Sequence, residues 1–460
     1  MPMRTRTTVK RIILVIVLAL LTYGIRYAWV SFPIISGFGA KNLCSCVFVA
    51  GRTEKSVREE ELGDSPLTLG SFTVDEKDSS VTGTVAGLAK RKAIYRKGLG
   101  CTLVNDVPEA ELRRQPFITA APPLVNPDTI AWPMGDLIKD SMPAGIHRDI
   151  LQAAVLGAFA ETNPKKKILT RAVLVLYDGK LVAEQYAPGY DRHSRMLGWS
   201  MSKSITGTLI GILVKQGKLQ LEAPAPVPEW KEPSDPRHAI TLQNLLQQTS
   251  GLNYVEDYSK ASSATNMLFK KGDMGAYVAG LPLKDKPGEL FYYSSGNSNI
   301  LSRIIRQTVG EESYHRFPAT ALFDKVGMYS AQPEPDASGT FVGSSYTYAT
   351  ARDWARFGLL YYNDGIWNGE RILPEGWVQQ ASTPVVTKDG PQEYGYQLWL
   401  GKLNPEQPFK AGEPADVFYA DGYGDQEVYI IPSKKLVIVR LGLHKFDLES
   451  LLAGVVKSIQ

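Results

Sequence analysis

The stretch Ser200-Met201-Ser202-Lys203 holds the residue types needed for serine-based acyl transfer without a histidine. Residues three apart at the first turn of a helix lie on one face, so the Lys203 amine would reach the Ser200 hydroxyl. Burial lowers the pKa of a lysine, and a neutral amine can accept the serine proton. The start of a helix also offers a free backbone N–H to a developing oxyanion. The pattern therefore predicts Ser200 as nucleophile and Lys203 as general base.

A histidine-based triad has less support in this sequence. An α/β-hydrolase carries its nucleophile in G-x-S-x-G, but the frame that begins at Gly198 has Ser202 in place of the second glycine. Neither Ser202 nor Ser204 has a lysine three residues further on. The five histidines form no H-x-x-x-H or H-E-x-x-H pair, so no metal site is predicted. A histidine base is unsupported, although it is not excluded.

The elements that must position these residues predict an α+β fold. β-rich runs on both sides of Asp178-Gly179 are typical of a hairpin, and apolar residues recur at helical spacing over 200–217. Further helices are expected at 240–252, 296–309 and 350–362, and two strands and a helix at 427–432, 435–442 and 447–460. We expect an antiparallel sheet flanked by helices, with an inserted helical lobe, over residues 166–460.

The N-terminus predicts an export signal in residues 1–38. Four basic residues precede the apolar run Ile12–Ile25, and Arg26 is followed by another apolar stretch to Phe38. The 14-residue run is shorter than the ~20 residues of a full span, but no A-x-A cleavage site follows it and Arg26 can snorkel to a membrane surface. We favour an uncleaved anchor over a cleaved signal. The basic end stays cytoplasmic, so the rest is expected to be exported, periplasmic or extracytoplasmic.

Residues 39–165 predict a β-rich extension followed by a wrapping linker. Strand-like alternation covers 47–104, and proline is frequent in 116–133. In an exported chain, we expect a disulfide between Cys101 and either Cys44 or Cys46, which leaves one cysteine free.

The overall composition is that of a globular protein. Hydrophobic residues make up 44% of the 460 residues, and 51 basic side chains face 47 acidic ones, for a net charge of +4. Because nucleic-acid binding needs basic residues clustered on one face, this balance gives no support for a nucleic-acid partner.

Four stretches of the chain, in this order, resemble the serine β-lactamase-related family: 198–224, 240–254, 286–305 and 350–378. This family includes class C β-lactamases, D-alanyl peptidases, esterases and the 6-aminohexanoate-dimer (nylon oligomer) hydrolases. The resemblance extends from Arg171 to Gln460 and is strongest to the nylon oligomer branch. It implies the β-lactamase-like fold and a catalytic serine in S-x-x-K.

The resemblance also implies a second motif, Y-x-N, which here reads Tyr293-Ser294-Ser295. Tyr293 would share the proton transfer with Lys203, whose charge would lower the phenol pKa; Tyr292 fits the motif frame less well. Ser295 would take the hydrogen-bonding place of the asparagine, with Asn297 as a substitute.

A third motif, K-T-G or H-x-G, matches best at 422–432, with Tyr423 in the place of the cation. A backbone N–H of Asp425 or Gln426 would complete an oxyanion hole with that of Ser200. Asp257 and Tyr258 lie in the segment that forms a loop over the pocket in this family, and they are candidates for substrate contact.

The expected function is hydrolysis of amides or esters through an acyl-enzyme on Ser200. Short oligoamides, D-amino peptides and carboxylic esters are favoured over β-lactams, because the third motif lacks its cation. No cofactor is expected, and the expected partners are a small or peptide-like substrate and the membrane. The alternatives are a β-lactamase and a weak or inactive penicillin-binding-like cell-wall module, since two of the three motifs are altered.

Overall fold

A computed structural model describes residues 3–121, 126–138, 142–163, 166–401 and 416–459. A six-stranded antiparallel sheet with the strand order β14-β15-β16-β17-β5-β6 forms its centre. These strands are β5 (Ala172–Tyr177), β6 (Lys180–Tyr186), β14 (Trp399–Leu400), β15 (Phe418–Gly422), β16 (Gln426–Ile431) and β17 (Leu436–Leu441). Asp178 and Gly179 both have positive φ, which is the geometry of a tight hairpin turn, and the expected β5–β6 hairpin is confirmed.

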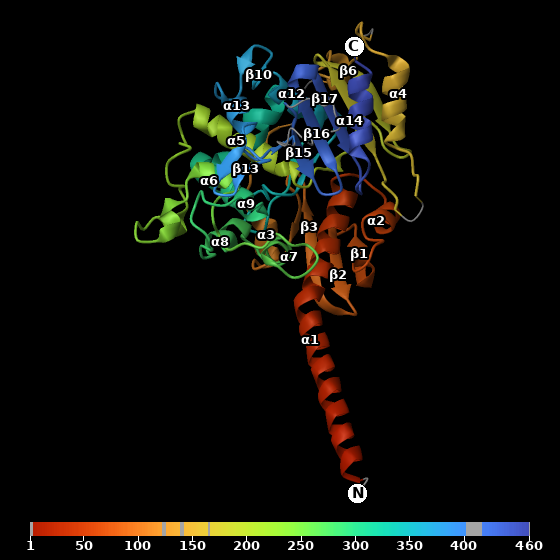
Figure 1. The fold of residues 1–460 in the computed structure, drawn as a ribbon, viewed down its shortest axis with the longest axis vertical. Coiled ribbons are helices and arrows are strands. Elements are labelled where there is room, and N and C mark those ends of the chain that lie inside the picture. Colours follow the sequence, from red (N-terminus) through yellow and green to blue (C-terminus); the bar gives the residue numbers. More distant parts are fainter. Residues whose placement is uncertain (1–2, 122–125, 139–141, 164–165, 402–415, 460) are drawn as a thin grey trace.

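Helices cover both faces of this sheet (Figure 1). α5 (Met201–Lys215) and α12 (Ala351–Tyr362) pack on one face, while α4 (Arg148–Gly157) and α14 (Leu448–Lys457) pack on the other. Successive side chains of a strand point to opposite faces of the sheet. Ala420 of β15 packs in the core on the face covered by α5 and α12, and Tyr429 of β16 packs in the core on the face covered by α4 and α14. The predicted α+β fold with helices on an antiparallel sheet is confirmed.

The inserted lobe between β6 and β14 is mainly helical. It contains α6 (Leu242–Leu246), α7 (Ser263–Lys270), α8 (Met274–Ala279), α9 (Ser295–Val309), α10 (Glu311–Tyr314), α11 (Asp324–Val326) and α13 (Trp377–Ala381). The small strands are β7 (Met196–Leu197), β8 (Gln332–Pro333), β9 (Thr347–Ala349), β10 (Ile366–Trp367), β11 (Glu370–Arg371), β12 (Val385–Thr387) and β13 (Gly390–Gln392). The helix expected at 240–252 is only five residues long, because Gln248 and Gly251 take left-handed backbone conformations that end it.

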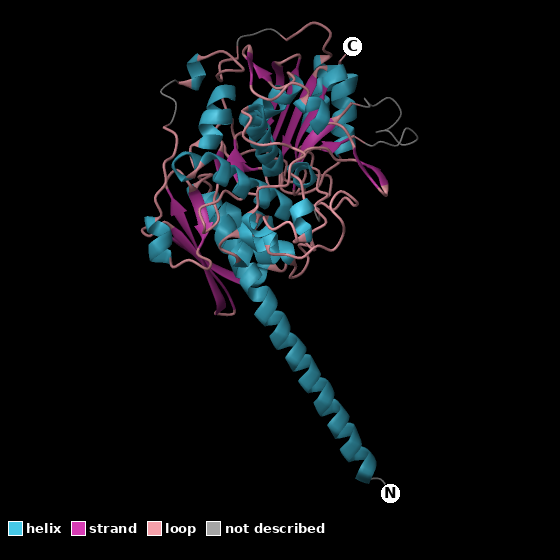
Figure 2. Cartoon of the chain, turned by 90° about the vertical axis from the view of Figure 1, so that its left-hand side faces the viewer, coloured by secondary structure: helices cyan, strands magenta, loops and turns pink. Residues whose placement is uncertain are grey.

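The N-terminal helix α1 (Met3–Phe48) is the longest element, and its first half projects away from the body (Figure 2). From Ile35 onward the helix is buried against β1 (Gly70–Asp75), β2 (Ser80–Val85), β3 (Leu88–Arg96) and β4 (Gly100–Leu103). The short helices α2 (Glu54–Glu60) and α3 (Glu109–Arg114) flank this sheet. The expected β-rich extension is present, but residues 39–48 are helical, and the expected boundary at residue 38 falls inside α1.

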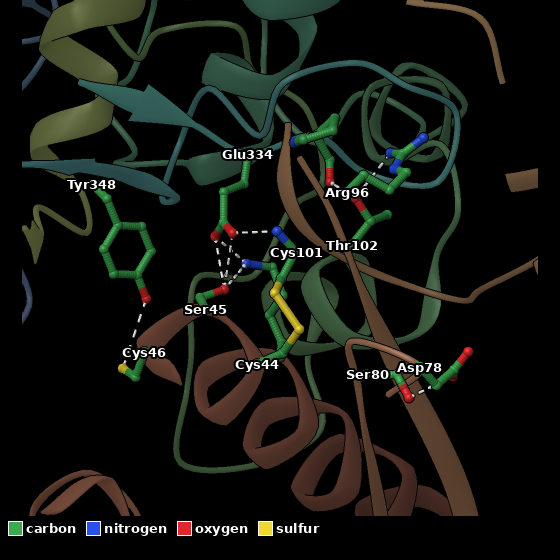
Figure 3. The surroundings of a disulfide bond; sticks show 12 residues. Cys44, Ser45, Cys46, Asp78, Ser80, Arg96, Cys101, Thr102, Glu334 and Tyr348 are labelled. Carbon is green, nitrogen blue, oxygen red and sulfur yellow. Dashed lines mark hydrogen bonds and ion pairs between the residues drawn. A yellow bond between two sulfur atoms is a disulfide. The ribbon is translucent and has the colours of Figure 1, made fainter. Parts of the chain in front are cut away.

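Polar and covalent contacts join the buried end of α1 to the body (Figure 3). Cys44 forms a disulfide with Cys101, which decides between the two expected pairings, and Cys46 is free and buried. Glu334 of the inserted lobe accepts hydrogen bonds from Lys41 at 2.5 Å and from the Cys101 backbone N–H at 2.5 Å. The second half of α1 is therefore part of the folded body.

Candidate active site

Ser200 and Lys203 meet at the start of α5, as their spacing predicts. Ser200 is the N-cap residue, and Lys203 lies one turn later, where its side chain is 1% exposed. The lysine Nζ donates hydrogen bonds to Ser200 Oγ at 3.0 Å and to the Ser344 carbonyl at 3.1 Å. A serine hydroxyl within hydrogen-bond reach of an amine is the geometry of an activated nucleophile.

The residue before the serine has a strained backbone. Trp199 has a φ of 46°, a conformation that non-glycine residues rarely adopt and that clusters at functional sites. Its ring lies among three aromatic rings, with centroid distances of 6.2 Å to Phe38, 6.1 Å to Tyr346 and 6.0 Å to Tyr423. Phe38 belongs to α1, so the N-terminal helix supports the wall of the site beside Ser200.

Tyr293 precedes α9 and reaches the same point. Its hydroxyl is hydrogen-bonded to Ser200, and Lys203 Nζ lies 4.8 Å from its ring centroid. Burial raises the pKa of Tyr293 well above 10, with a further contribution from Tyr394 that outweighs the bond to Ser200. The expected lowering of this pKa by Lys203 is thus wrong, and Tyr293 stays a neutral phenol at ordinary pH. Tyr292 points elsewhere, since its hydroxyl accepts a bond from the Glu256 N–H and the residue is 46% exposed.

A carboxylate that the sequence reading missed lies beside these groups. Glu256 accepts hydrogen bonds from the Ser295 hydroxyl at 2.6 Å, the Ser295 backbone N–H at 2.8 Å and the Tyr258 hydroxyl at 2.7 Å. Ser295 Oγ also accepts a bond from Lys203 Nζ at 3.0 Å. Ser295 therefore connects Lys203 to Glu256, and the site contains an acidic group next to its lysine. Glu256 directly precedes Asp257 and Tyr258, the two residues already noted for loop contacts, but no motif identifies it.

The electrostatic surroundings set the ionisation of Lys203. Burial lowers the pKa of Lys203 to about 8, and the carboxylates of Glu256 and Asp421 oppose this shift. Asp421 lies on β15, on the face opposite to α5, and burial together with the charge of Asp425 raises its pKa to about 7. A lysine with a pKa of about 8 is partly neutral near pH 7 to 8 and can accept a proton.

β15 is the strand that borders the site. β15 ends at Gly422, where a Cβ atom would come within 2.2 Å of the Gly198 carbonyl oxygen, so only glycine allows this close approach to the strand before Ser200. Tyr423 follows directly, 67% exposed and against the edge of Trp199.

Asp425 and Gln426 make hydrogen bonds with β17 and with the segment that follows it. The Asp425 carboxylate accepts the Phe446 N–H, and its carbonyl accepts a bond from Arg440. The Gln426 side chain bonds the Gly442 backbone. These contacts use the side chains and the Asp425 carbonyl, and the expected oxyanion role of the Asp425 or Gln426 backbone N–H stays a prediction.

Two of the expected substrate contacts are also engaged within the protein. Asn297 is 1% exposed, donates to the Gln248 side chain at 2.9 Å and accepts a bond from Ser250, so it is a structural residue of the lobe and not a substitute for Ser295. Asp257 accepts two bonds from Ser259 and pairs with Lys260, which organises its own loop. Tyr258 differs, because its hydroxyl reaches Ser295 at 3.1 Å while the residue remains 51% exposed.

The described residues contain no group of three or more His, Cys, Asp or Glu side chains that could hold a metal ion.

Sequence comparison shows which proteins this chain resembles. The Beta-lactamase family profile matches residues 153–442. The 6-aminohexanoate-dimer hydrolase of Paenarthrobacter ureafaciens is 27% identical over 307 residues, which are 62% of this chain and 70% of that protein. The protein Flp of Staphylococcus aureus strain MRSA252 is 35% identical over 253 residues, which cover 49% of this chain and 44% of Flp.

Solved structures show the same fold. A Bacillus anthracis protein, provisionally named a 6-aminohexanoate-dimer hydrolase, superposes with a TM-score of 0.55 and 22% identity over 72% of this chain and 87% of that one. A family VIII carboxylesterase superposes with a TM-score of 0.53 and 14% identity over 70% of this chain and 99% of that one. With the profile match over more than half of its length, the chain belongs to the Beta-lactamase family, whose members are serine hydrolases.

Proposed function

We propose that this protein is a serine hydrolase that cleaves amide or ester bonds through an acyl-enzyme on Ser200. The observation that carries the proposal is the 3.0 Å hydrogen bond from the buried Lys203 amine to Ser200 Oγ. In the reactive state the neutral amine takes the hydroxyl proton while Oγ forms a bond to the substrate carbonyl carbon. The oxygen of the resulting tetrahedral intermediate carries the negative charge.

Two backbone N–H groups are proposed to hold this oxyanion. The first belongs to Ser200, which stands at the head of α5, where N–H groups lie outside the helical hydrogen-bond ladder. The second is assigned to Tyr423, because Gly422 approaches the backbone just before Ser200. Removal of one such donor typically costs about 10²- to 10³-fold in kcat.

Tyr293 is proposed as the acid for the leaving group. Its phenol is neutral and bonded to Ser200, so it can donate its proton to the departing nitrogen or oxygen and regain one from the Lys203 ammonium. The scissile bond then breaks and leaves the acyl group on Ser200. Water repeats the sequence on the acyl-enzyme, which releases the carboxylic acid and returns the proton to Ser200.

The charges around the site favour substrates without a carboxylate next to the scissile bond. β15 presents Ala420 and Gly422 towards α5, neither of which can bind an anion through its side chain, and Glu256 adds negative charge. β-Lactams carry a carboxylate beside the reactive ring, so we propose neutral or cationic oligoamides and carboxylic esters as the substrate class. The relative from P. ureafaciens is named for an oligoamide of this kind.

The exposed half of α1 is proposed to anchor the protein in a membrane, with the hydrolase on the periplasmic or other extracytoplasmic side. One helix within Thr8–Phe48 is long and apolar enough to cross a bilayer, and a signal sequence passes the same test. The burial of residues 35–48 in the body supports an anchor that stays attached, because cleavage after residue 38 would remove Phe38 from Trp199.

A fluorophosphonate probe tests the proposed enzyme directly. We expect the full chain in detergent to be labelled on Ser200, as identified by peptide mass spectrometry, and to hydrolyse p-nitrophenyl esters. Ser200→Ala should lose both signals. Ser202→Ala should keep the label, because the Ser202 hydroxyl accepts a hydrogen bond from the Thr347 N–H and takes no part in the proposed reaction. Absence of both labelling and hydrolysis would instead favour an inactive cell-wall module.

The pH profile offers a second prediction, based on Glu256. With Lys203 as base, kcat/KM should rise with pH through an apparent pKa of about 8. The negative charge of Glu256 raises the pKa of Lys203, so Glu256→Gln should move this limb to lower pH. Steady-state rates from pH 5 to 10, with Asp257→Asn as the control in the same loop, measure the shift. A limb that stays in place or moves to higher pH would show that Glu256 does not act on the base.

A further inference from the structure

The exposed part of α1 matches the thickness of a bilayer. Residues Val9–Trp29 are exposed almost without interruption, and 21 helical residues span about 31 Å, close to the ~30 Å hydrocarbon core. Lys10 and Arg11 lie at one end of this segment, and Arg26, Tyr27 and Trp29 lie at the other, where the arginine can snorkel to the surface and the two aromatic residues are 50% and 83% exposed. Aromatic side chains of this kind favour the membrane interface, so the body would meet the membrane just after Trp29.

The β-sheet of the extension runs beside α1 towards this point. The Ser36 hydroxyl donates to the Ala89 carbonyl at 2.6 Å, and further along both chains Phe48 stacks on Tyr95. β3 therefore runs alongside α1 in the same direction, and the β2–β3 turn at Ala86 and Gly87 lies on the membrane side of Ser36. Figures 1 and 2 both show this hairpin next to α1 where the helix leaves the body.

The end of α7 lies at the same level. Lys270 Nζ donates to the Val30 carbonyl at 2.8 Å, directly next to the last exposed turn of α1. The lysine is followed by Lys271, and the β2–β3 hairpin carries Lys90 and Arg91. Burial lowers the pKa of Lys270, and the charges of Arg91 and Lys271 lower it further. These cations repel one another, and Asp106 is the carboxylate that acts on Arg91.

Exposed leucines complete this surface. Leu88 at the hairpin is 63% exposed and Leu69 is 55% exposed, and Gly70, next to Leu69, pairs with Val85 beside the same turn. A surface that combines cations with protruding apolar side chains suits a phospholipid headgroup layer. We name this set of residues the collar: Leu69, Leu88, Lys90, Arg91, Lys270 and Lys271.

We propose that the collar rests on an anionic phospholipid surface and holds the catalytic body in one orientation on the membrane. The proposal rests on α1 as the anchor. The collar proposal goes beyond the anchor, because α1 continues into the core without a linker. The body therefore cannot turn freely above the bilayer. Phe38, which packs on Trp199 beside Ser200, is eight residues after Val30, or about 12 Å along the helix. The nucleophile therefore lies close to the headgroups, where substrates held at the membrane surface reach it.

An environment-sensitive fluorophore on the collar tests this proposal in the full chain. Leu88→Cys is labelled with a nitrobenzoxadiazole dye and reconstituted into nanodiscs of phosphatidylcholine with or without phosphatidylglycerol. We expect a blue-shifted and brighter emission in the anionic discs. Val386→Cys, on the β12–β13 hairpin and 73% exposed, is the matched control and should not change.

Charge reversal distinguishes lipid contact from mere proximity. In the double variant Lys90→Glu/Lys271→Glu, the equilibrium constant for contact of the collar with anionic rather than neutral discs should fall by about fivefold per charge. The control variant Lys218→Glu/Lys434→Glu, at exposed sites outside the collar, should retain the preference for anionic discs. Equal emission in neutral and anionic discs, or no effect of the collar charges, would overturn the proposal. Copurification with the discs reports the anchor, and ester hydrolysis reports Ser200 independently. Failure to copurify would overturn both the anchor and the collar without bearing on the hydrolase.

Discussion

Replacement of Lys203 by methionine is expected to lower kcat/KM for a p-nitrophenyl ester by about 10⁴-fold, the upper range for the loss of a general base. The expected loss is large because Lys203 contacts Ser200, Ser295 and the ring of Tyr293 together. Methionine has a similar length and no charge, so it fits the buried position while it removes the proton acceptor. Steady-state kinetics, together with burst labelling by the fluorophosphonate probe, measure the effect.

Lys215→Met is the matched control for this experiment. Lys215 lies in the last turn of the same helix, exposed to solvent, and contacts the Arg371 carbonyl. It should keep the rate of the unaltered protein, and both variants should show similar thermal unfolding. If Lys203→Met retained full activity, the proposed mechanism would be refuted and the alternative of a histidine base would be favoured.

Replacement of Glu334 by alanine is expected to lower the free energy of unfolding by about 3–5 kcal/mol. Glu334 is fully buried, pairs with Lys41 of α1, and also accepts bonds from Ser45 and the Cys101 N–H. Its removal leaves the buried Lys41 charge without a carboxylate, with only the Ser45 hydroxyl and the Tyr346 ring beside it, which costs far more than the loss of an exposed ion pair. Urea denaturation of the full chain in detergent, followed by circular dichroism, measures the change.

Two controls separate the charge effect from the loss of packing. Glu311→Ala removes a pair with Arg306 in which the carboxylate side chain is 70% exposed, and it should cost less than about 1 kcal/mol. Lys41→Met/Glu334→Leu removes both buried charges and should recover much of the stability. If Glu334→Ala cost no more than Glu311→Ala, the buried pair would not hold α1 to the body.

The sequence alone determined the features that depend on neighbours along the chain. Ser200 and Lys203 are three residues apart, and helical geometry brings them together wherever α5 packs. The β5–β6 hairpin follows from Asp178-Gly179, which accepts the positive φ of a tight turn. The apolar run after Lys10 and Arg11 predicted the projecting half of α1 for the same local reason.

Only the tertiary structure decided the features that depend on contacts between distant segments. Glu256 enters the site because its loop folds over α9, and Asn297 leaves it because α9 turns that side chain towards Gln248. The pKa of Tyr293 moves upward, against the sequence expectation, because burial and the neighbouring Tyr394 outweigh the hydrogen bond to Ser200. Cys44 rather than Cys46 meets Cys101 because α1 continues as a helix past residue 38 and turns one cysteine towards β4. Burial and side-chain direction are properties of the packed chain, and short sequence patterns do not contain them.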